Sequence, residues 1–326
     1  MVLQSIWGWQ PALYLFLGGM GAGAFIMAAV LYLIDQERHA KIVCVSMWAS
    51  AIGLGLGLLL LLSELTQPAR GLLMWQSFSH FTSWMTYGAW GAFAAIAVFG
   101  LSAVLAVDKV GKRCTSEKQA KHFVCVRKVL AVVGIALGLF VAVYTGMLLM
   151  MAPGVPLWNT PLLPCLFAVS GIDTGVALVE VIAVLLARKD PLAPRARVLM
   201  ERIVVFLVVV ECVVLSAFLL SMASGVGSAA AAAGAQSAEL LTLGSLAPYF
   251  WGMVVVCGLV LPLAMAVTGL ALHGRGAERG AKPGYDYPMA IGAVGALIGG
   301  CALRFLVLAA GVHAEIVAET VMSLVA

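Results

Sequence analysis

Four ionisable side chains lie inside long apolar stretches of the sequence, where such groups are rare. They are Asp173 and Glu180 in residues 164–187, Glu211 in 202–223 and Arg304 in 288–311. Because Asp173 and Glu180 are seven residues apart, they are expected on one face of a helix. Ionisable groups at membrane depth are costly, and most are paired with one another or functional. Two interpretations stay open: a static buried ion pair, for example of Arg304 with Asp173, and a pathway for protons or a ligand.

A second group of polar side chains lies near one end of three other apolar stretches. Its members are Tyr14, Tyr144, Glu64, Gln10 and His80, with Trp7, Trp9 and Trp84 at the same level. A hydroxyl donor and a carboxylate between aromatic walls suit a quinone, since its carbonyls accept hydrogen bonds and its protons need an acceptor. A belt of aromatic residues at the membrane interface also explains the Trp and Tyr residues.

The carboxylate of this second group stands at a boundary in the sequence. Glu64 ends an uncharged apolar stretch, Pro68 breaks the pattern, and the next apolar stretch begins at Trp84. The loop between them carries Arg70, Trp75 and His80. A carboxylate at a membrane boundary is costly, so Glu64 marks either a functional position or simply the end of a helix.

The composition identifies the elements that must hold these groups. The chain has 326 residues, of which 63% are hydrophobic and 10% are charged, and its mean hydropathy is +1.07. This composition is typical of a polytopic membrane protein. The apolar stretches match helices of about 20 residues that cross a bilayer, and strand-like alternation is absent.

We predict eight transmembrane helices in one membrane domain that covers residues 1–326. The predicted spans are residues 12–34, 44–64, 84–107, 128–151, 164–187, 202–223, 246–272 and 288–311. The expected fold is an all-α integral membrane protein whose helices pack as two four-helix bundles. No basic region precedes the first span, so we expect it to be retained and not cleaved as a signal.

The distribution of basic residues predicts the orientation. Every Lys and Arg except Arg70 and Arg304 lies between the first and second, third and fourth, fifth and sixth, or seventh and eighth spans, or, as Lys128 and Arg202, at the first residue of the span that follows. Basic loops stay on the cytoplasmic side, so both termini are expected on the opposite, outward side of the membrane. Because these residues form no extended basic surface, membrane lipid is expected as a partner and nucleic acid is not.

Histidine and cysteine patterns argue against a redox centre held by this chain. None of the five histidines lies in the middle of a span, whereas a membrane haem needs paired axial ligands there. The seven cysteines contain no CxxC pair. We therefore expect no intrinsic haem and no iron–sulfur cluster.

Small residues predict how the helices pack. Glycines four residues apart recur at Gly19/Gly23, Gly53/Gly57, Gly134/Gly138, Gly171/Gly175 and Gly295/Gly299. This spacing lets helix backbones approach closely in lipid. Outside the spans, residues 224–238 are expected to form an interfacial helix or a flexible loop, and residues 312–326 a short surface helix.

Several short motifs, taken together, resemble those of the NrfD family, the membrane subunits typified by polysulfide reductase. The matching segments are residues 9–23 (WQPALYLFLGGMGAG), 68–70 (PAR), 82–90 (TSWMTYGAW), 144–146 (YTG), 156–160 (PLWNT) and 299–304 (GGCALR). Their order and spacing extend over nearly the whole sequence.

The resemblance implies a function as well as a fold. Members of this family have eight spans and outward termini, and they exchange electrons between membrane quinone and an outward-facing four-cluster iron–sulfur protein. That protein connects to a molybdopterin catalytic subunit. By the same resemblance Tyr144 matches the quinone-side tyrosine, Tyr14 stands where some members have a histidine, and Glu64 lies farther from Pro68 than the family's acidic residue does.

The sequence therefore favours a quinone-binding membrane anchor in a bacterial inner membrane, not catalytic by itself. The quinone is expected to be menaquinone or ubiquinone, near Tyr144, Tyr14, Glu64, His80 and Gln10. Asp173, Glu180, Glu211 and Arg304 are expected to handle protons. A proton-coupled secondary transporter and a purely structural anchor remain as alternatives.

Overall fold

The computed structural model is almost entirely helical and describes residues 2–4, 7–36, 38–64, 84–107, 116–223, 228–276 and 287–314. The long helices are α1 (Trp9–Ile34), α2 (Ala40–Glu64), α4 (Trp84–Leu105), α6 (Glu117–Met150), α7 (Leu162–Leu186), α8 (Pro194–Ala223) and α12 (Tyr287–Ala309). A further rod joins α10 (Ala247–Tyr249), the π-helix η2 (Phe250–Val260) and α11 (Leu261–Gly276). Within the described residues, eight helices are long and apolar enough to span a membrane, which confirms the predicted number.

Two of these helices begin well before the predicted spans. α6 starts at Glu117 and α8 at Pro194, whereas the sequence predicted residues 128 and 202. At the start of α6, Ser116 and Gln119 form a capping box and Lys121 Nζ lies 2.7 Å from Glu117 Oε1. These polar contacts stabilise helix outside the apolar region, so α6 is about 50 Å long, more than a bilayer core requires.

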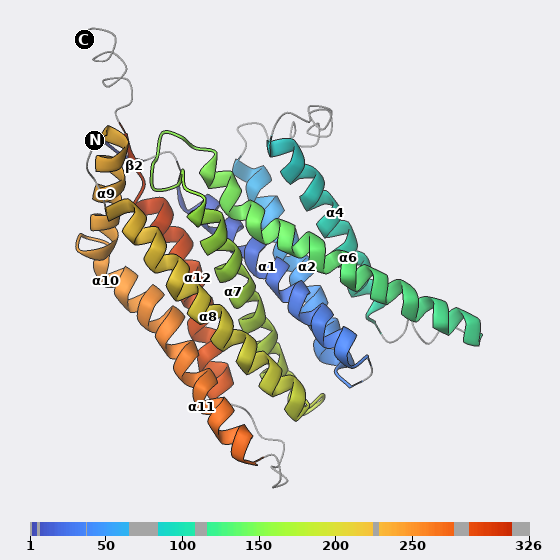
Figure 1. Cartoon of the computed structure of the whole chain (residues 1–326). Helices are drawn as coiled ribbons and strands as arrows, with labels where there is room; N and C mark the ends of the chain where they lie inside the picture. The colour runs from blue at the N-terminus through green and yellow to red at the C-terminus, as the bar shows by residue number, and fades with distance from the viewer. Residues whose placement is uncertain are drawn as a thin grey trace.

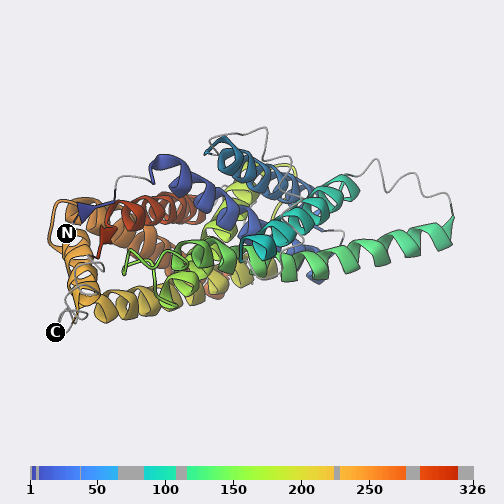
Figure 2. The same cartoon turned by 90° about the horizontal axis from the view of Figure 1, so that it is seen from above.

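The helices fall into two sets of neighbours, with α1 and α7 in contact between them. In the first set, α1 and α4 each pack against both α2 and α6. In the second, α7 and α11 each pack against both α8 and α12. Figures 1 and 2 show the first set, in blue to green, beside the second, in yellow-green to red.

Glycine pairs lie where these helices approach one another most closely, as predicted. Gly19 of α1 faces Gly171 of α7, where an added β-carbon would lie 3.3 Å from the Gly171 Cα. One turn further along, a β-carbon at Gly175 would overlap the backbone of Gly23. Larger residues here would force α1 and α7 apart, so these glycines hold the two sets together.

The rod that forms the seventh span contains an irregularity. Residues Phe250–Val260 follow π-helical hydrogen bonding, and Pro262 is the second residue of α11, which follows them. Proline removes one backbone donor and its ring clashes with the carbonyl four residues earlier, so a wider turn before it relieves the conflict. The same segment places Gly258 against Gly299 of α12.

Two short strands tie the molecule together at one end. β1 (Val2–Leu3) pairs antiparallel with β2 (Val312–His313), and Gln4 Nε2 donates to Leu308 O at 3.0 Å. We call this the β end; α2, α6, α8 and α12 end there and α4 begins there (Figure 1). The tail predicted as a helix thus begins as a strand, because residues 312 and 313 pair with β1; residues 315–326 lie outside the described residues.

The low-complexity stretch also has a defined structure at the β end. Residues Ala229–Thr242 form helix α9, and Ser228 Oγ accepts a hydrogen bond from Ala231 N at its start. Of the two predicted alternatives, the helix is therefore correct for the described part of this stretch. α9 packs against α8 and β2.

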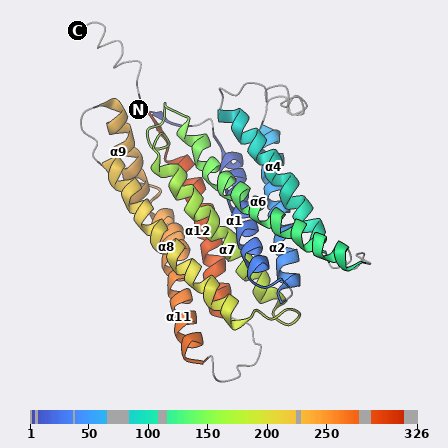
Figure 3. The same cartoon turned by 45° about the vertical axis from the view of Figure 1, so that its right-hand side comes forward.

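At the opposite end, α1, α4, α7 and α11 finish and most basic residues lie, so we call it the basic end. Asp190, in the connection between α7 and α8, accepts hydrogen bonds from Lys41 N (2.9 Å) and Ile42 N (3.0 Å). The carboxylate thereby satisfies the open donors at the start of α2. Figure 3 shows α6 and α11 extending past their neighbours at this end.

Candidate functional site

Three residues of the second predicted group converge near the β end. Tyr14 comes from α1, Glu64 is the last residue of α2, and Tyr144 lies six residues before the end of α6 at Met150. The Tyr14 hydroxyl lies beside the Glu64 carboxylate, close enough to donate a hydrogen bond, and it also interacts with Tyr144. We call these three residues the tyrosine–glutamate site.

The neighbouring helix α4 fixes the position of Tyr144. The Tyr144 hydroxyl donates to the backbone oxygen of Trp84 at 3.2 Å, and its ring stacks on Phe140 with centroids 5.8 Å apart. A β-carbon at Gly88 would overlap the Tyr144 ring, so Gly88 leaves the space that the ring occupies. The adjacent Gly146 has a different role, because a β-carbon there would overlap Pro164 of α7.

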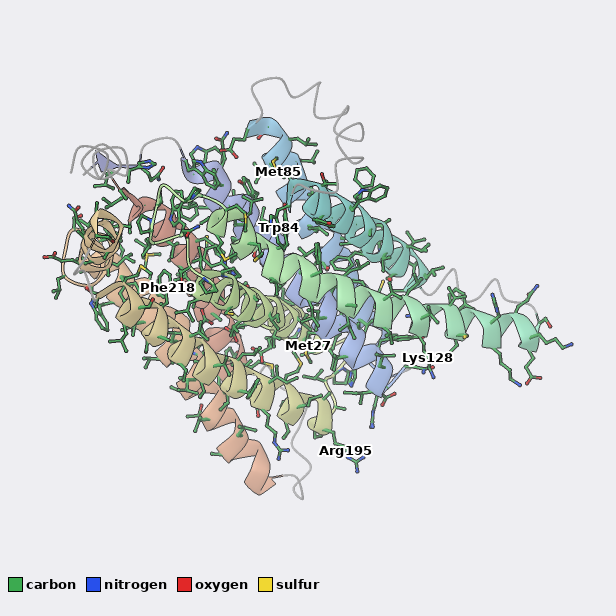
Figure 4. The ribbon with its side chains drawn as sticks, turned by 45° about the horizontal axis from the view of Figure 1, so that its top comes forward. Met27, Trp84, Met85, Lys128, Arg195 and Phe218 are labelled. Carbon is green, nitrogen blue, oxygen red and sulfur yellow. The ribbon has the colours of Figure 1, made fainter. Side chains whose placement is uncertain are left out.

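The tyrosine–glutamate site is partly open. Tyr14 is 8% exposed, whereas Glu64 and Tyr144 are half-buried. The structure therefore places one hydroxyl donor and one carboxylate where a ligand dissolved in the membrane could reach them. Figure 4 labels Trp84 at this end of the molecule, far from Lys128 and Arg195 at the basic end.

The other members of this predicted group stand differently. Gln10 is half-buried one turn before Tyr14 on α1, and no hydrogen bond among the described residues joins it to the site. His80, with Arg70 and Trp75, lies outside the described residues. Trp9 and Trp84 are more than half exposed, as expected of an aromatic belt.

The first predicted group forms a buried row through the second set of helices. Arg304 of α12 is completely buried and donates to Ser170 Oγ (2.7 Å), Gly300 O (2.7 Å) and Phe167 O (3.2 Å). Its guanidinium also lies 5.2 Å from the centre of the Phe167 ring. Arg304 is thus held mainly by neutral groups of α7 and of its own helix.

Two carboxylates lie near this guanidinium without touching it. Glu211 is within hydrogen-bond reach of Ser170, and both Glu211 and Asp173 interact electrostatically with Arg304. Among the described residues Arg304 makes no direct salt bridge with either one. Asp173 Oδ1 is buried and has no hydrogen-bond partner in this part of the structure. The direct Arg304–Asp173 pair considered from the sequence is therefore not formed.

The row continues toward the basic end through Glu180 to a residue that sequence reasoning missed. Glu180 interacts with Asp173 and also with Glu201 of α8, which is 4% exposed. The sequence placed Glu201 in a loop because the predicted span began at Arg202. Its signal was periodicity: Glu201, Val204, Val208, Glu211 and Leu215 are buried at helical spacing along α8.

One helix separates the two groups of ionisable residues. On α1, Tyr14 faces Glu64 and Tyr144, whereas Phe16 lies near Arg304, whose guanidinium is 6.0 Å from the centre of the Phe16 ring. A β-carbon at Gly19 would lie 3.5 Å from Arg304 Nη2. The tyrosine–glutamate site and the buried row therefore share α1 as a common wall.

The fold and these two groups define a multi-pass helical membrane protein that holds ionisable side chains between its helices. Within that class the protein belongs to the NrfD family: the family model described as "Polysulphide reductase, NrfD" matches residues 1–315. It is similar to the C subunit of polysulfide reductase from Wolinella succinogenes, with 32% identity over 321 residues that cover 94% of each sequence. It is also similar to protein NrfD of Escherichia coli K12, with 28% identity over 326 residues, 94% of this sequence and 95% of that one.

Proposed function

We propose that this protein is the quinone- or quinol-binding membrane subunit of a respiratory molybdopterin oxidoreductase complex. The observation that carries the proposal is the convergence of Tyr14, Glu64 and Tyr144 from three helices at the partly open β end. Family membership supports it, because one relative is named as a part of polysulfide reductase. The substrate is menaquinone or ubiquinone.

The chemistry assigned to the tyrosine–glutamate site is quinol oxidation or its reverse. A quinol that becomes a quinone loses two electrons and two protons. In the proposed arrangement the Tyr144 hydroxyl turns from Trp84 O to a quinone oxygen. Glu64, beside Tyr14, accepts the two protons one after the other and releases each to the solvent at the β end before it takes the next. The electrons pass to a partner protein, since this protein is expected to hold no haem or iron–sulfur cluster. His80 and Gln10 are assigned to the rim of the same site.

The proposed partners dock on the β end. An iron–sulfur protein with four clusters covers residues 65–83 and 152–164, and it carries a molybdopterin catalytic subunit. The ordered connection at 152–164 supports this assignment, because Trp158 Nε1 donates to Val307 O at 2.9 Å and fixes the loop to α12. Electrons then have a short route from the tyrosine–glutamate site.

We further propose that the β end faces outward from a bacterial inner membrane and that the two sets of helices act as two four-helix bundles. Each set forms a closed ring of neighbours, α1–α2–α4–α6 and α7–α8–α11–α12, which supports this description. The orientation rests on the positive-inside distribution of Lys and Arg.

The orientation predicts how α6 reacts with a thiol reagent. With Cys114, Cys125 and Cys165 changed to serine, a Lys121→Cys variant should react with an impermeant maleimide only after the membrane is opened. A matched Leu243→Cys variant, exposed beyond α9 at the β end, should react in intact cells. Labelling of Lys121→Cys in intact cells would reverse the orientation and with it the docking face.

The buried row is assigned to proton handling. Arg304, a single guanidinium, lies near Asp173 and Glu211 and can balance one negative charge, and Glu180 lies farther along the row. Carboxyl groups left without a balancing charge in a dry interior hold protons or exchange them. A proton-coupled transporter would also move protons along the buried row. A purely structural anchor would need neither the buried row nor quinol for its function.

The decisive experiment is purification of the complex that contains this protein in mild detergent. Mass spectrometry should identify an iron–sulfur protein and a molybdopterin subunit, and the complex should react with both quinol and artificial dyes. Removal of this protein should abolish quinol-linked turnover and leave dye-linked turnover. If quinol-linked activity survives removal of this protein, the protein is only a structural anchor. If the protein purifies without redox partners, the transporter function is favoured.

A further inference from the structure

A small cavity lies inside the second set of helices, between the buried row and the basic end. Three carboxyl groups line it, Asp173 and Glu180 from α7 and Glu201 from α8. α11 and α12 complete the wall with apolar residues such as Met265 and Met289. Its volume of about 10 Å³ matches the room that one water molecule needs.

The polar groups around this cavity indicate what it holds. Asp173 lines it, and Asp173 Oδ1 is buried without a hydrogen-bond partner among the described residues. Buried polar atoms of this kind are normally satisfied, often by an ordered water with several polar partners. Glu180 and Glu201 supply two further partners. The site is therefore large enough and polar enough for one bridging water.

The position of Glu201 links the cavity to one side of the membrane. Glu201 lies seven residues inside the start of α8 at Pro194, which corresponds to about 10 Å of helix. Asp173 is about twice as far from the same end, counted along α7 to Leu186. Glu180, six residues before Leu186, lies at about the same depth as Glu201, so two of the carboxyl groups lie nearer the basic end and Asp173 lies deeper.

The facing helix α11 leaves room for Glu201. A β-carbon at Gly269 would overlap Glu201 Oε1 and lie 2.8 Å from its carboxyl carbon. No other residue type would leave this carboxylate in place. The backbone of α11 therefore packs directly against this buried carboxylate, which lines the cavity.

We propose that this cavity is a hydrated proton site and that Glu201 is its cytoplasmic entrance. A proton taken up at Glu201 passes through the bound water to Glu180 and then to Asp173, and the net change at each step is the movement of one proton. Toward the β end, Asp173 faces Glu211 and Arg304, which continue the row. The inference deepens the proposed proton handling and rests on the proposed orientation.

The test measures proton uptake from the side of the basic loops, per electron, by the assembled complex in sealed vesicles with quinol as donor. Glu201→Gln should lose most of this uptake, and Glu201→Asp should restore part of it. Glu239→Gln is the matched control, since Glu239 is an exposed carboxylate on α9, and it should match the unmodified complex. Unchanged uptake in assembled Glu201→Gln overturns the inference.

A second pair of variants keeps every carboxyl group and serves as the test if the Glu201→Gln variant does not fold. Gly269→Ala should lower proton uptake because its methyl group displaces Glu201. Gly252→Ala, on the same rod with open space around its β-carbon, should leave uptake unchanged. Normal proton uptake in the assembled Gly269→Ala complex overturns the inference. So does an unmodified complex that takes up no protons from the side of the basic loops. Either result leaves the proposed quinol binding intact.

A chemical probe separates the cavity from the proposed quinone function. Dicyclohexylcarbodiimide couples to protonated carboxyl groups in apolar surroundings, and mass spectrometry maps the modified peptides. We expect modification at Glu180 or Glu201 even if the complex shows no quinol activity, and loss of the Glu201 adduct in Glu201→Gln. Modification of other carboxyl groups but none of the three in the cavity overturns the inference.

Discussion

The tyrosine–glutamate site and the buried row both combine carboxyl groups with hydrogen-bonding partners, but they differ in access. Glu64 and Tyr144 are half-buried at helix ends, where a membrane-soluble molecule can approach. Asp173, Glu180, Glu201 and Glu211 are each at most 5% exposed. The first region is therefore accessible enough for the proposed quinone, while the second is enclosed and suits only the proposed water and protons.

Packing explains this difference. In the first set, α4 packs against both α2 and α6. Its Gly88 leaves the space that the Tyr144 ring occupies. The second set closes around Arg304, which three oxygen atoms on α7 and α12 hold in place. The half-buried Tyr144 hydroxyl suits exchange of a ligand, whereas the fully buried guanidinium of Arg304 suits a permanent charge.

The largest effect is expected at Arg304. Arg304→Met removes the guanidinium near Glu211 and Asp173, and an uncompensated buried charge typically costs about 3–5 kcal/mol. We expect loss of most folded protein, measured by gel filtration of the detergent extract. Arg304→Lys keeps the charge but not the forked hydrogen bonds, so an intermediate yield is expected. A normal yield of Arg304→Met would mean that the row needs no fixed charge.

Tyr144→Phe tests the open site with a smaller but specific effect. The change keeps the ring and removes the donor, and a hydrogen bond left unmade in a dry site costs roughly 1–3 kcal/mol. Quinol-linked turnover should fall about tenfold. Dye-linked turnover of the same complex should be unchanged, because dyes bypass the quinone.

Two results would decide the role of Tyr144. A parallel fall in dye-linked turnover would indicate disturbed assembly, and Tyr14→Phe would then replace it as the test. Full quinol turnover in an assembled Tyr144→Phe complex would remove this tyrosine from the site.

The sequence predicted depth along the membrane better than neighbours across it. Apolar length fixes each span, so Tyr14, Glu64 and Tyr144 could be assigned to one level before their helices were placed. Lateral order is not encoded in that pattern. The contact of Tyr144 with Gly88 and the shared wall of α1 therefore appear only in the structure.

Charged residues near span boundaries were the main source of error. Glu201 follows a basic segment and precedes Arg202, so hydropathy placed it outside the membrane, although α8 buries it beside Glu180. Likewise, a pair of Arg304 with Asp173 was one of the two interpretations left open by the sequence, but Ser170 and two backbone oxygens accept the hydrogen bonds of Arg304. Polar contacts that hydropathy cannot represent decided both cases.

Gly88→Ala sharpens the comparison by disturbing Tyr144 without changing its chemistry. The added methyl group overlaps the Tyr144 ring, and extra volume in a packed site costs about 1–3 kcal/mol, part of which the ring avoids by moving. Quinol-linked turnover should fall about fivefold. The matched control is Gly100→Ala on the same helix α4, where a β-carbon meets nothing within 4 Å. Equal turnover in the two variants would show that the Tyr144 position is not critical.

The smallest effect on electron transfer is expected at Glu180, although its effect on protons should be clear. Glu180→Gln keeps the volume and a hydrogen-bonding group in the enclosed row, so the complex should assemble, and uncoupled quinol turnover should stay within about twofold. The number of protons moved per electron should fall, because an amide cannot carry a proton from Glu201 toward Asp173. Vesicles with a trapped pH indicator measure this number directly. An unchanged ratio in the assembled variant would make the row a structural feature, and a fall in turnover equal to that of Tyr144→Phe would join the two regions into one site.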